Sequence, residues 1–106
     1  MKHIFFVIDT ESNSGNQAEM AAIDAFNDKL KSESKLVLAA GIGSSKTAKL
    51  FDNRQGANLI ETSSLNGPEF YSGFWIIDAE PSEIEDLARQ ASLACNRKIE
   101  VRAFLA

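Results

Sequence analysis

The sequence has one cysteine, one histidine and no apolar run long enough to cross a membrane. Cys95 has no partner for an intramolecular disulfide, and it cannot by itself supply a zinc site made of cysteines. His3 is the only histidine, which excludes any metal site that needs two histidines from one chain. We therefore expect neither a metal nor a cofactor.

Long hydrophobic segments are also missing. The apolar runs hold about half a dozen residues at most, whereas a membrane-spanning helix needs roughly twenty. The run behind the basic N-terminus stops at Asp9 and lacks the small-residue cleavage site of a signal peptide. These features predict a cytoplasmic protein that has no membrane partner.

Basic residues are outnumbered by acidic ones. The chain carries 11 Lys and Arg against 15 Asp and Glu, which gives a net charge of -4 and a pI near 4.9. Nucleic-acid phosphates are held by clustered Lys and Arg, but here the basic residues are scattered among acids. The composition therefore disfavours nucleic acid as the main partner.

The chain is short enough to form a single domain over residues 1–106, and its apolar content of 44% is ordinary for a globular protein. Residues 3–8 (HIFFVI) and 35–42 (KLVLAAGI) are short apolar segments that predict strands. Residues 17–34 between them predict a helix, because apolar residues recur there at three- and four-residue steps. The predicted apolar face consists of Met20, Ile23, Phe26 and Leu30.

A hairpin and a second strand–helix–strand unit are predicted for the rest of the chain. Residues 47–53 and 57–62 are expected to pair, with a turn at Gln55 and Gly56. Residues 82–96 predict a helix in which Ser82 and Glu85 have the spacing of a capping box. The flanking strands are expected at residues 71–80 and 98–105.

This order predicts an α+β fold of the ferredoxin-like type, with two helices on one face of a four-stranded antiparallel sheet. Residues 4–8 (IFFVI) and 73–77 (GFWII) are apolar at successive positions, so both faces of their strands require burial. Two helices cover only one face. We therefore expect a homodimer whose sheets pack face to face, with a cleft between sheet and helices.

Five segments resemble, in order, those of the YCII-related or DGPF-type bacterial proteins. The resemblance implies a dimeric ferredoxin-like α+β barrel. Most members of that family have no assigned activity, although its relatives include small enzymes, a dehydrochlorinase-type branch among them, and proteins encoded beside sigma factors. The matching segments are MKHIFFVID, AIDAFNDKL, LVLAAGIGSSKTA, GFWIIDAE and IEVRAFL.

The chain departs from this family at two places. The Asp-Gly-Pro-Phe motif is replaced by NGPEF, in which Asn66 stands for the aspartate and Glu69 precedes the phenylalanine; an alternative alignment places ETSSL there. In the enzymatic branch that the chain resembles, the pattern has a histidine on the first helix. The predicted first helix of this chain has no histidine and carries Asp24 near that place. These departures leave open any acid–base role implied by the resemblance.

The segment GIGSSKTAK looks at first like a phosphate-binding loop. Such a loop needs glycine directly before the lysine and a helix that begins there. Here Ser45 precedes Lys46, and residues 47–53 are predicted to form a strand. The segment is therefore interpreted as a strand end that turns into the hairpin.

Candidate site residues are few. His3 and Asp24 are the candidate general bases, and Cys95 is expected to be a buried, inert thiol, with a reactive thiol beside Arg97 and Lys98 as the alternative. Nothing in the sequence places any two of Asp9, Asp24 and Asp78 together.

Two aromatic residues with polar tips are candidates for a cavity wall. Tyr71 and Trp75 are four positions apart and are expected on one side of their strand, with Phe74 on the other. Together with Asn66 they are the candidate ligand-binding residues, although burial in the core or the dimer interface is the alternative.

Three functions remain open at this point. The first is a small-ligand-binding or regulatory homodimer, which is favoured because no complete catalytic set is present. The second is a cofactor-free enzyme of the lyase or isomerase type, which would use the cavity between sheet and helices with His3 or Asp24 as base. The third is a protein that binds a transcription factor through its surface.

Overall fold

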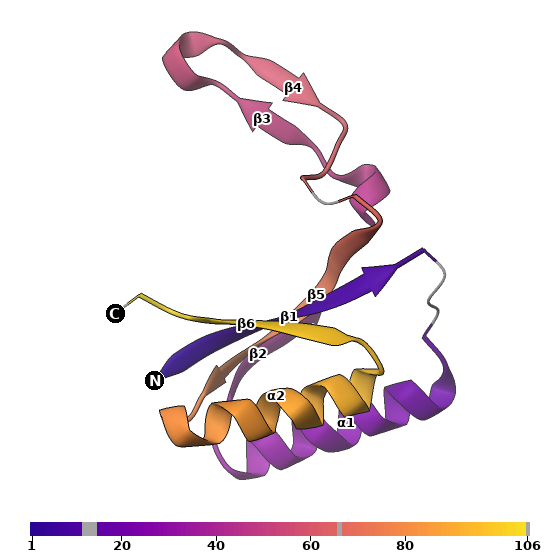
Figure 1. Ribbon diagram of the computed structural model, residues 1–106, viewed down its shortest axis with the longest axis vertical. Helices are drawn as coiled ribbons and strands as arrows, with labels where there is room; N and C mark the ends of the chain where they lie inside the picture. Colours follow the sequence, from indigo (N-terminus) through magenta and orange to yellow (C-terminus); the bar gives the residue numbers. More distant parts are fainter. Residues whose placement is uncertain (12–14, 66, 106) are drawn as a thin grey trace.

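The computed structural model describes residues 1–11, 15–65 and 67–105. The fold is α+β, with two long helices against one sheet and a separate hairpin (Figure 1). The strands of the main sheet are β1 (Lys2–Thr10), β2 (Leu36–Gly41), β5 (Glu69–Asp78) and β6 (Lys98–Ala103). The helices are α1 (Gln17–Ser32) and α2 (Pro81–Cys95).

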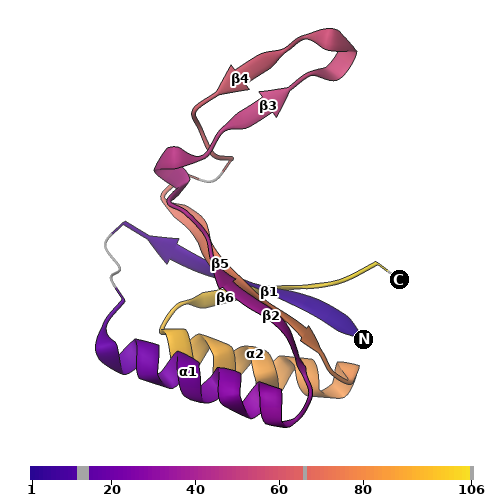
Figure 2. The ribbon, with the colours of Figure 1, turned by 180° about the vertical axis from the view of Figure 1, so that it is seen from behind.

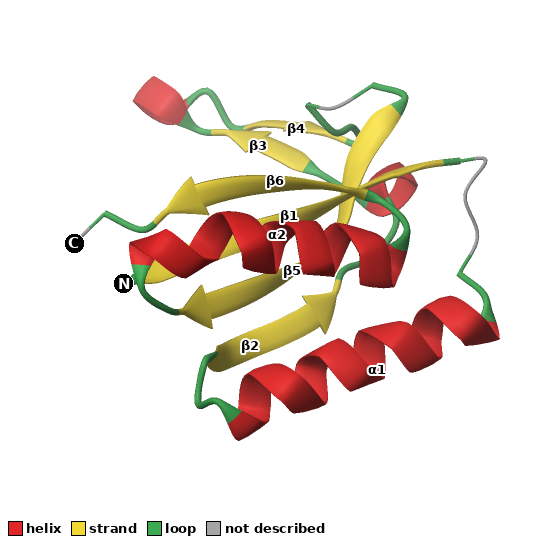
Figure 3. Cartoon of the chain, turned by 60° about the horizontal axis from the view of Figure 1, so that its bottom comes forward, coloured by secondary structure: helices red, strands yellow, loops and turns green. Residues whose placement is uncertain are grey.

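The main sheet has the strand order β2-β5-β1-β6, and every neighbouring pair is antiparallel. Both helices lie on the same face of this sheet (Figure 3). This arrangement confirms the predicted α+β class and is consistent with a ferredoxin-like fold. Among the described residues, no helix is long and apolar enough to cross a membrane.

The first helix begins where its N-terminal amide groups find an acceptor. The side chain of Asn16 accepts a hydrogen bond from the backbone N–H of Glu19 at 2.8 Å. Phe26 and Leu30 of the predicted apolar face are buried against the sheet, but Met20 is 55% exposed. The N-terminal half of α1 therefore packs less closely on the sheet than its C-terminal half.

The second helix begins earlier than predicted. Its capping box is formed by Glu80 and Glu83, with Pro81 in the first turn, so the predicted box of Ser82 and Glu85 is wrong. The backbone N–H groups of a first helical turn have no acceptor within the helix. Proline, which lacks this N–H, is therefore favoured at this position. The helix ends at Cys95 and is capped by Asn96, whose left-handed backbone conformation is one that asparagine tolerates.

The core lies between the helices and the face of the sheet that they cover. Phe5 and Ile77 are fully buried and Trp75 is 3% exposed; all three point toward the helices. The buried stripe of α2 completes this layer. Its residues are Ile84, Leu87, Ala91 and Cys95.

An irregularity in β5 changes which side chains face the helices. Val7 of β1 is paired with Gly73, but its neighbour Ile8 is paired with Tyr71, so Ser72 is an extra residue in β5. A Cβ atom on Gly73 would lie 2.8 Å from the carbonyl oxygen of Ala40 in β2. Glycine at this position therefore allows β2 and β5 to approach each other closely beside the irregularity.

The other face of the sheet carries apolar residues that neither α1 nor α2 covers (Figure 3). Phe6, Phe74 and Ile76 alternate with the buried side chains of β1 and β5, and all three are partly exposed. We call this surface the open face. The β3–β4 hairpin lies on the same side of the sheet, away from the helices (Figures 1 and 2).

The predicted hairpin is confirmed, although its strands are only three residues long. β3 (Leu50–Asp52) is antiparallel to β4 (Leu59–Glu61), and the turn between them has positive φ angles at Gln55 and Gly56. Phe51, Leu59 and Ile60 are each more than half exposed. A two-stranded hairpin with this surface has little to stabilise it on its own.

Candidate functional site

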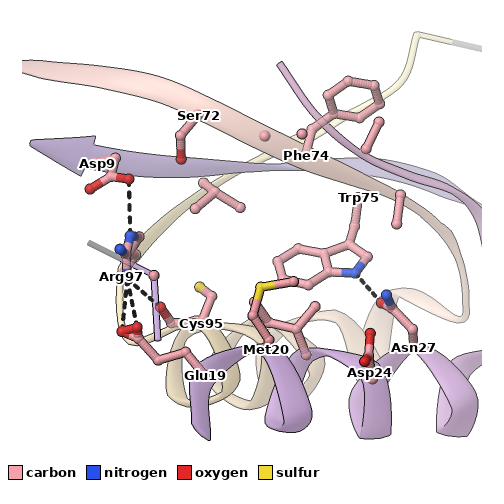
Figure 4. A pocket seen from close by; sticks show the side chains of 17 residues that line it. Asp9, Glu19, Met20, Asp24, Asn27, Ser72, Phe74, Trp75, Cys95 and Arg97 are labelled. Carbon is pink, nitrogen blue, oxygen red and sulfur yellow. Dashed lines mark hydrogen bonds and ion pairs between the residues drawn. The ribbon is translucent and has the colours of Figure 1, made fainter. Parts of the chain in front are cut away.

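A cavity of about 460 Å³ lies between α1 and the helix-facing side of β2, β5 and β1. Such a volume falls in the range of small-molecule sites. The apolar part of the wall combines strand residues that point toward the helices with the loosely packed N-terminal half of α1 (Figure 4). This part of the wall includes Val7, Met20, Ile23, Ala39 and Trp75.

Trp75 is fixed in the cavity wall by two contacts to α1. Its ring packs edge-to-face on Phe26, with the ring centroids 5.5 Å apart. The indole N–H donates a hydrogen bond to Oδ1 of Asn27 at 2.6 Å. The prediction that Trp75 belongs to a cavity wall or core therefore agrees with its position, since it serves both.

A buried ion cluster closes one end of the cavity. The Arg97 side chain is only 8% exposed; its Nε lies 3.1 Å from Asp9 and its Nη1 lies 3.3 Å from Glu19. Nη1 also donates a hydrogen bond to the backbone oxygen of Cys95 at 2.8 Å. The cluster joins the end of β1, the first turn of α1 and the segment after α2 (Figure 4).

The electrostatics of this cluster favour the charged form of the guanidinium. Burial alone would lower the pKa of Arg97, but hydrogen bonds to Asp9 and Glu19 outweigh it and raise that pKa. Arg97 therefore stays charged and holds the two carboxylates, a pairing that the sequence did not predict.

Of the two candidate bases, Asp24 and His3, only Asp24 lies at the cavity. Asp24 lines the cavity and is exposed at its mouth. His3 is 9% exposed in β1 and is not a lining residue; its Nδ1 is buried and has no hydrogen-bond partner among the described residues. The structure thus brings one of the two candidates to the cavity.

Cys95 lines the cavity but is 3% exposed. Burial raises the pKa of its thiol. A raised pKa lowers the fraction of reactive thiolate at neutral pH. The position therefore agrees with the expected buried thiol rather than with the reactive alternative.

Tyr71 and Trp75 face opposite sides of the sheet, so the prediction that they share one side is wrong. The extra residue Ser72 reverses the alternation between them. Tyr71 stacks on Phe6 of the open face, with ring centroids 4.3 Å apart, and its hydroxyl donates a hydrogen bond to Glu100 at 2.7 Å. Tyr71 is not among the residues that line the cavity.

The remaining candidates lie away from the cavity or outside the described residues. Asn66, predicted to bind ligand, is outside the described residues. Asp78 pairs with the amino group of Met1 at 2.8 Å. Ser45–Thr47 forms only a three-residue 3₁₀ turn, so no long helix begins at Lys46. Among the residues that the structure describes, no three metal-ligating side chains gather.

Arg97 and Glu19 are the site residues that sequence reasoning missed. They are 78 positions apart, and neither belongs to a motif. One signal was available: Arg97 follows a predicted helix end, where its side chain can reach the neighbouring elements. Against known proteins, no family model matches the chain and no curated sequence is significantly similar to it.

Proposed function

We propose that the protein binds a small, largely apolar ligand in the cavity between α1 and the sheet, and that it does so as a homodimer. The observation that carries the proposal is a cavity of about 460 Å³ with apolar walls and a fixed polar end. Concave sites of this kind, with few polar groups that orient a ligand, are typical of small-molecule binding.

The dimer is supported by the apolar surfaces that one chain leaves uncovered. The open face carries Phe6, Phe74 and Ile76, and the hairpin on the same side exposes Phe51 to 70%. Exposed apolar surface on one side of a molecule favours association. A second copy that packs sheet against sheet would bury it and form a dimeric α+β barrel, as the resemblance to YCII-related proteins implies.

An enzyme of the lyase or isomerase type is the second candidate, and Asp24 is the observation that favours it. A carboxylate at the mouth of an apolar cavity can accept a proton from a bound substrate. Binding without chemistry is favoured over catalysis because His3 does not line the cavity. The two other carboxylates among the described lining residues, Asp9 and Glu19, are held by Arg97. Cysteine chemistry is disfavoured by the burial of Cys95.

Trp75 provides the test of binding, because it is the only tryptophan and its indole N–H gives a single NMR resonance. Fragments that enter the cavity should shift this resonance. Ala39→Leu should reduce the shift, because Ala39 lines the cavity opposite Trp75 in the neighbouring strand and the larger side chain obstructs that part of it. The matched control is Ala22→Leu on the exposed surface of α1. Equal responses in the two variants would contradict the proposed site.

The dimer has a separate test. Sedimentation should give twice the single-chain mass at micromolar concentration, and Ile76→Lys on the open face should give the single-chain mass. Burying two lysines in the interface would cost more than the apolar contact contributes. Ala22→Lys, on the exposed side of α1, should remain dimeric. A single-chain mass for the unaltered protein would overturn the dimer but leave the cavity proposal intact.

A further inference from the structure

The cavity is negatively charged although it contains an arginine. Asp9, Glu19 and Asp24 line it together with Arg97, and these are the charged side chains among its described lining residues. At neutral pH three carboxylates oppose one guanidinium, which leaves a formal charge of -2. The low-dielectric walls strengthen this field inside the cavity.

The charge of Arg97 is already shared by two carboxylates of the chain itself. Its Nε and Nη1 atoms are already engaged by Asp9, Glu19 and the backbone oxygen of Cys95. Releasing the guanidinium toward an incoming anion would leave two mostly buried carboxylates without their partner, which is costly. The usual inference from a buried arginine to an anionic ligand therefore fails here.

Asp24 differs from the other two carboxylates. Its side chain makes no hydrogen bond or ion pair with any residue of the described ranges, whereas Asp9 and Glu19 share Arg97. Asp24 follows Glu19 by five positions on α1, which corresponds to about 7.5 Å along the helix axis. Asp24 thus lies away from the ion cluster, toward the end where Trp75 meets Asn27 (Figure 4).

We infer that the cavity takes a ligand with an apolar body and a basic amino group, which pairs with Asp24. The inference rests on the proposed binding function. The apolar body lies against Trp75, Met20 and Ile23, and the ammonium group sits at the mouth, where it keeps part of its hydration. An anionic analogue of the same size is repelled by the net negative charge of the cavity.

Three compounds of similar shape test the charge: 2-phenylethylamine, 2-phenylethanol and 3-phenylpropanoate. Their dissociation constants are measured from the Trp75 indole N–H resonance at low salt. The amine should bind about two- to fivefold more tightly than the alcohol, as expected for one ion pair at a solvated site. The carboxylate should bind more weakly than the alcohol, and added salt should reduce both differences.

Asp24→Asn should remove the preference for the amine, while affinity for the alcohol stays the same. Asp28→Asn is the matched control, because Asp28 is exposed on the same helix and does not line the cavity. It changes the net charge equally and should retain the preference.

The possible results distinguish the charge preference of the cavity from ligand binding itself. If the alcohol and the carboxylate bind as tightly as the amine, or if the two Asn variants behave alike, the charge preference is overturned and the cavity stands. If no compound of any charge shifts the Trp75 resonance, and a wider fragment set also fails, the proposed binding function falls, and this inference falls with it.

Discussion

The two faces of the main sheet use adjacent residues of the same strands in different ways. Phe5 is fully buried under the helices, whereas its neighbour Phe6 is partly exposed on the open face. Trp75 is likewise buried under the helices, whereas its neighbour Ile76 is partly exposed on the open face. An uninterrupted apolar run in this chain therefore encodes two surfaces, one that forms the core and one that neither helix covers.

The cavity lies at the margin of the covered face, where helix packing becomes incomplete. Phe26 and Leu30 hold the C-terminal half of α1 on the sheet, but Met20 near its N-terminus is more than half exposed. The Arg97 cluster ties the N-terminal end of this helix to β1 instead. The cavity lies beside this cluster, where the apolar residues of α1 do not fill the space above the sheet.

The largest expected effect comes from truncating the two adjacent phenylalanines separately. Phe5→Ala should lower the free energy of unfolding by about 3–5 kcal/mol, because it leaves a cavity in a fully packed core. Phe6→Ala should cost the single chain much less and should mainly weaken the proposed dimer. Urea denaturation measures the first effect and sedimentation at several concentrations measures the second.

Equal losses of unfolding free energy in the two variants would remove the distinction between the faces. Phe6 also stacks on Tyr71, so part of its effect belongs to the single chain. Unfolding of Phe6→Ala should therefore be measured at concentrations at which both proteins are monomeric.

The coarse fold could be predicted because it depends on local patterns. The apolar periodicity of α1, the alternation in β6 and the turn at Gln55 and Gly56 are all readable over short stretches. The α2 start was misplaced because Glu80 can cap a helix as Ser82 can, and the preference of proline for the first turn decides between them.

The site was only partly predictable because it depends on long-range contacts. Asp24 and Trp75 were expected near a cavity, but one extra residue at Ser72 turned Tyr71 to the open face. Strand alternation does not reveal such a bulge in advance. The pairing of Arg97 with Glu19 depends on the packing of α1 beside α2, which no short pattern encodes.

An intermediate effect on stability is expected from adding a side chain at Gly73, beside the irregularity in β5. Gly73→Ala should cost about 1–3 kcal/mol of unfolding free energy, because its Cβ would lie 2.8 Å from the backbone oxygen of Ala40. Gly41→Ala is the control, since its Cβ would meet Ser72 at an ordinary 3.8 Å. Thermal unfolding of both variants makes the comparison, and equal midpoints would show that β2 moves away without cost.

The smallest effect concerns the polar group on the open face. The hydrogen bond from the Tyr71 hydroxyl, followed by that from Arg102, holds the pKa of Glu100 below its ordinary value. A carboxylate with a lowered folded-state pKa stabilises the protein above its unfolded-state pKa, and this contribution is lost as the pH falls through the lowered value. Tyr71→Phe should therefore reduce the unfolding midpoint at neutral pH and have a shrinking effect in acid.

Glu100→Gln separates this effect from the loss of a hydroxyl on the sheet. In that background the carboxylate is absent, so Tyr71→Phe should lower the unfolding midpoint by an amount that does not vary with pH. Persistence of the acid dependence in the double variant would mean that another carboxylate governs it. In that case Tyr71 would contribute to the open face through its ring on Phe6 rather than through its hydroxyl.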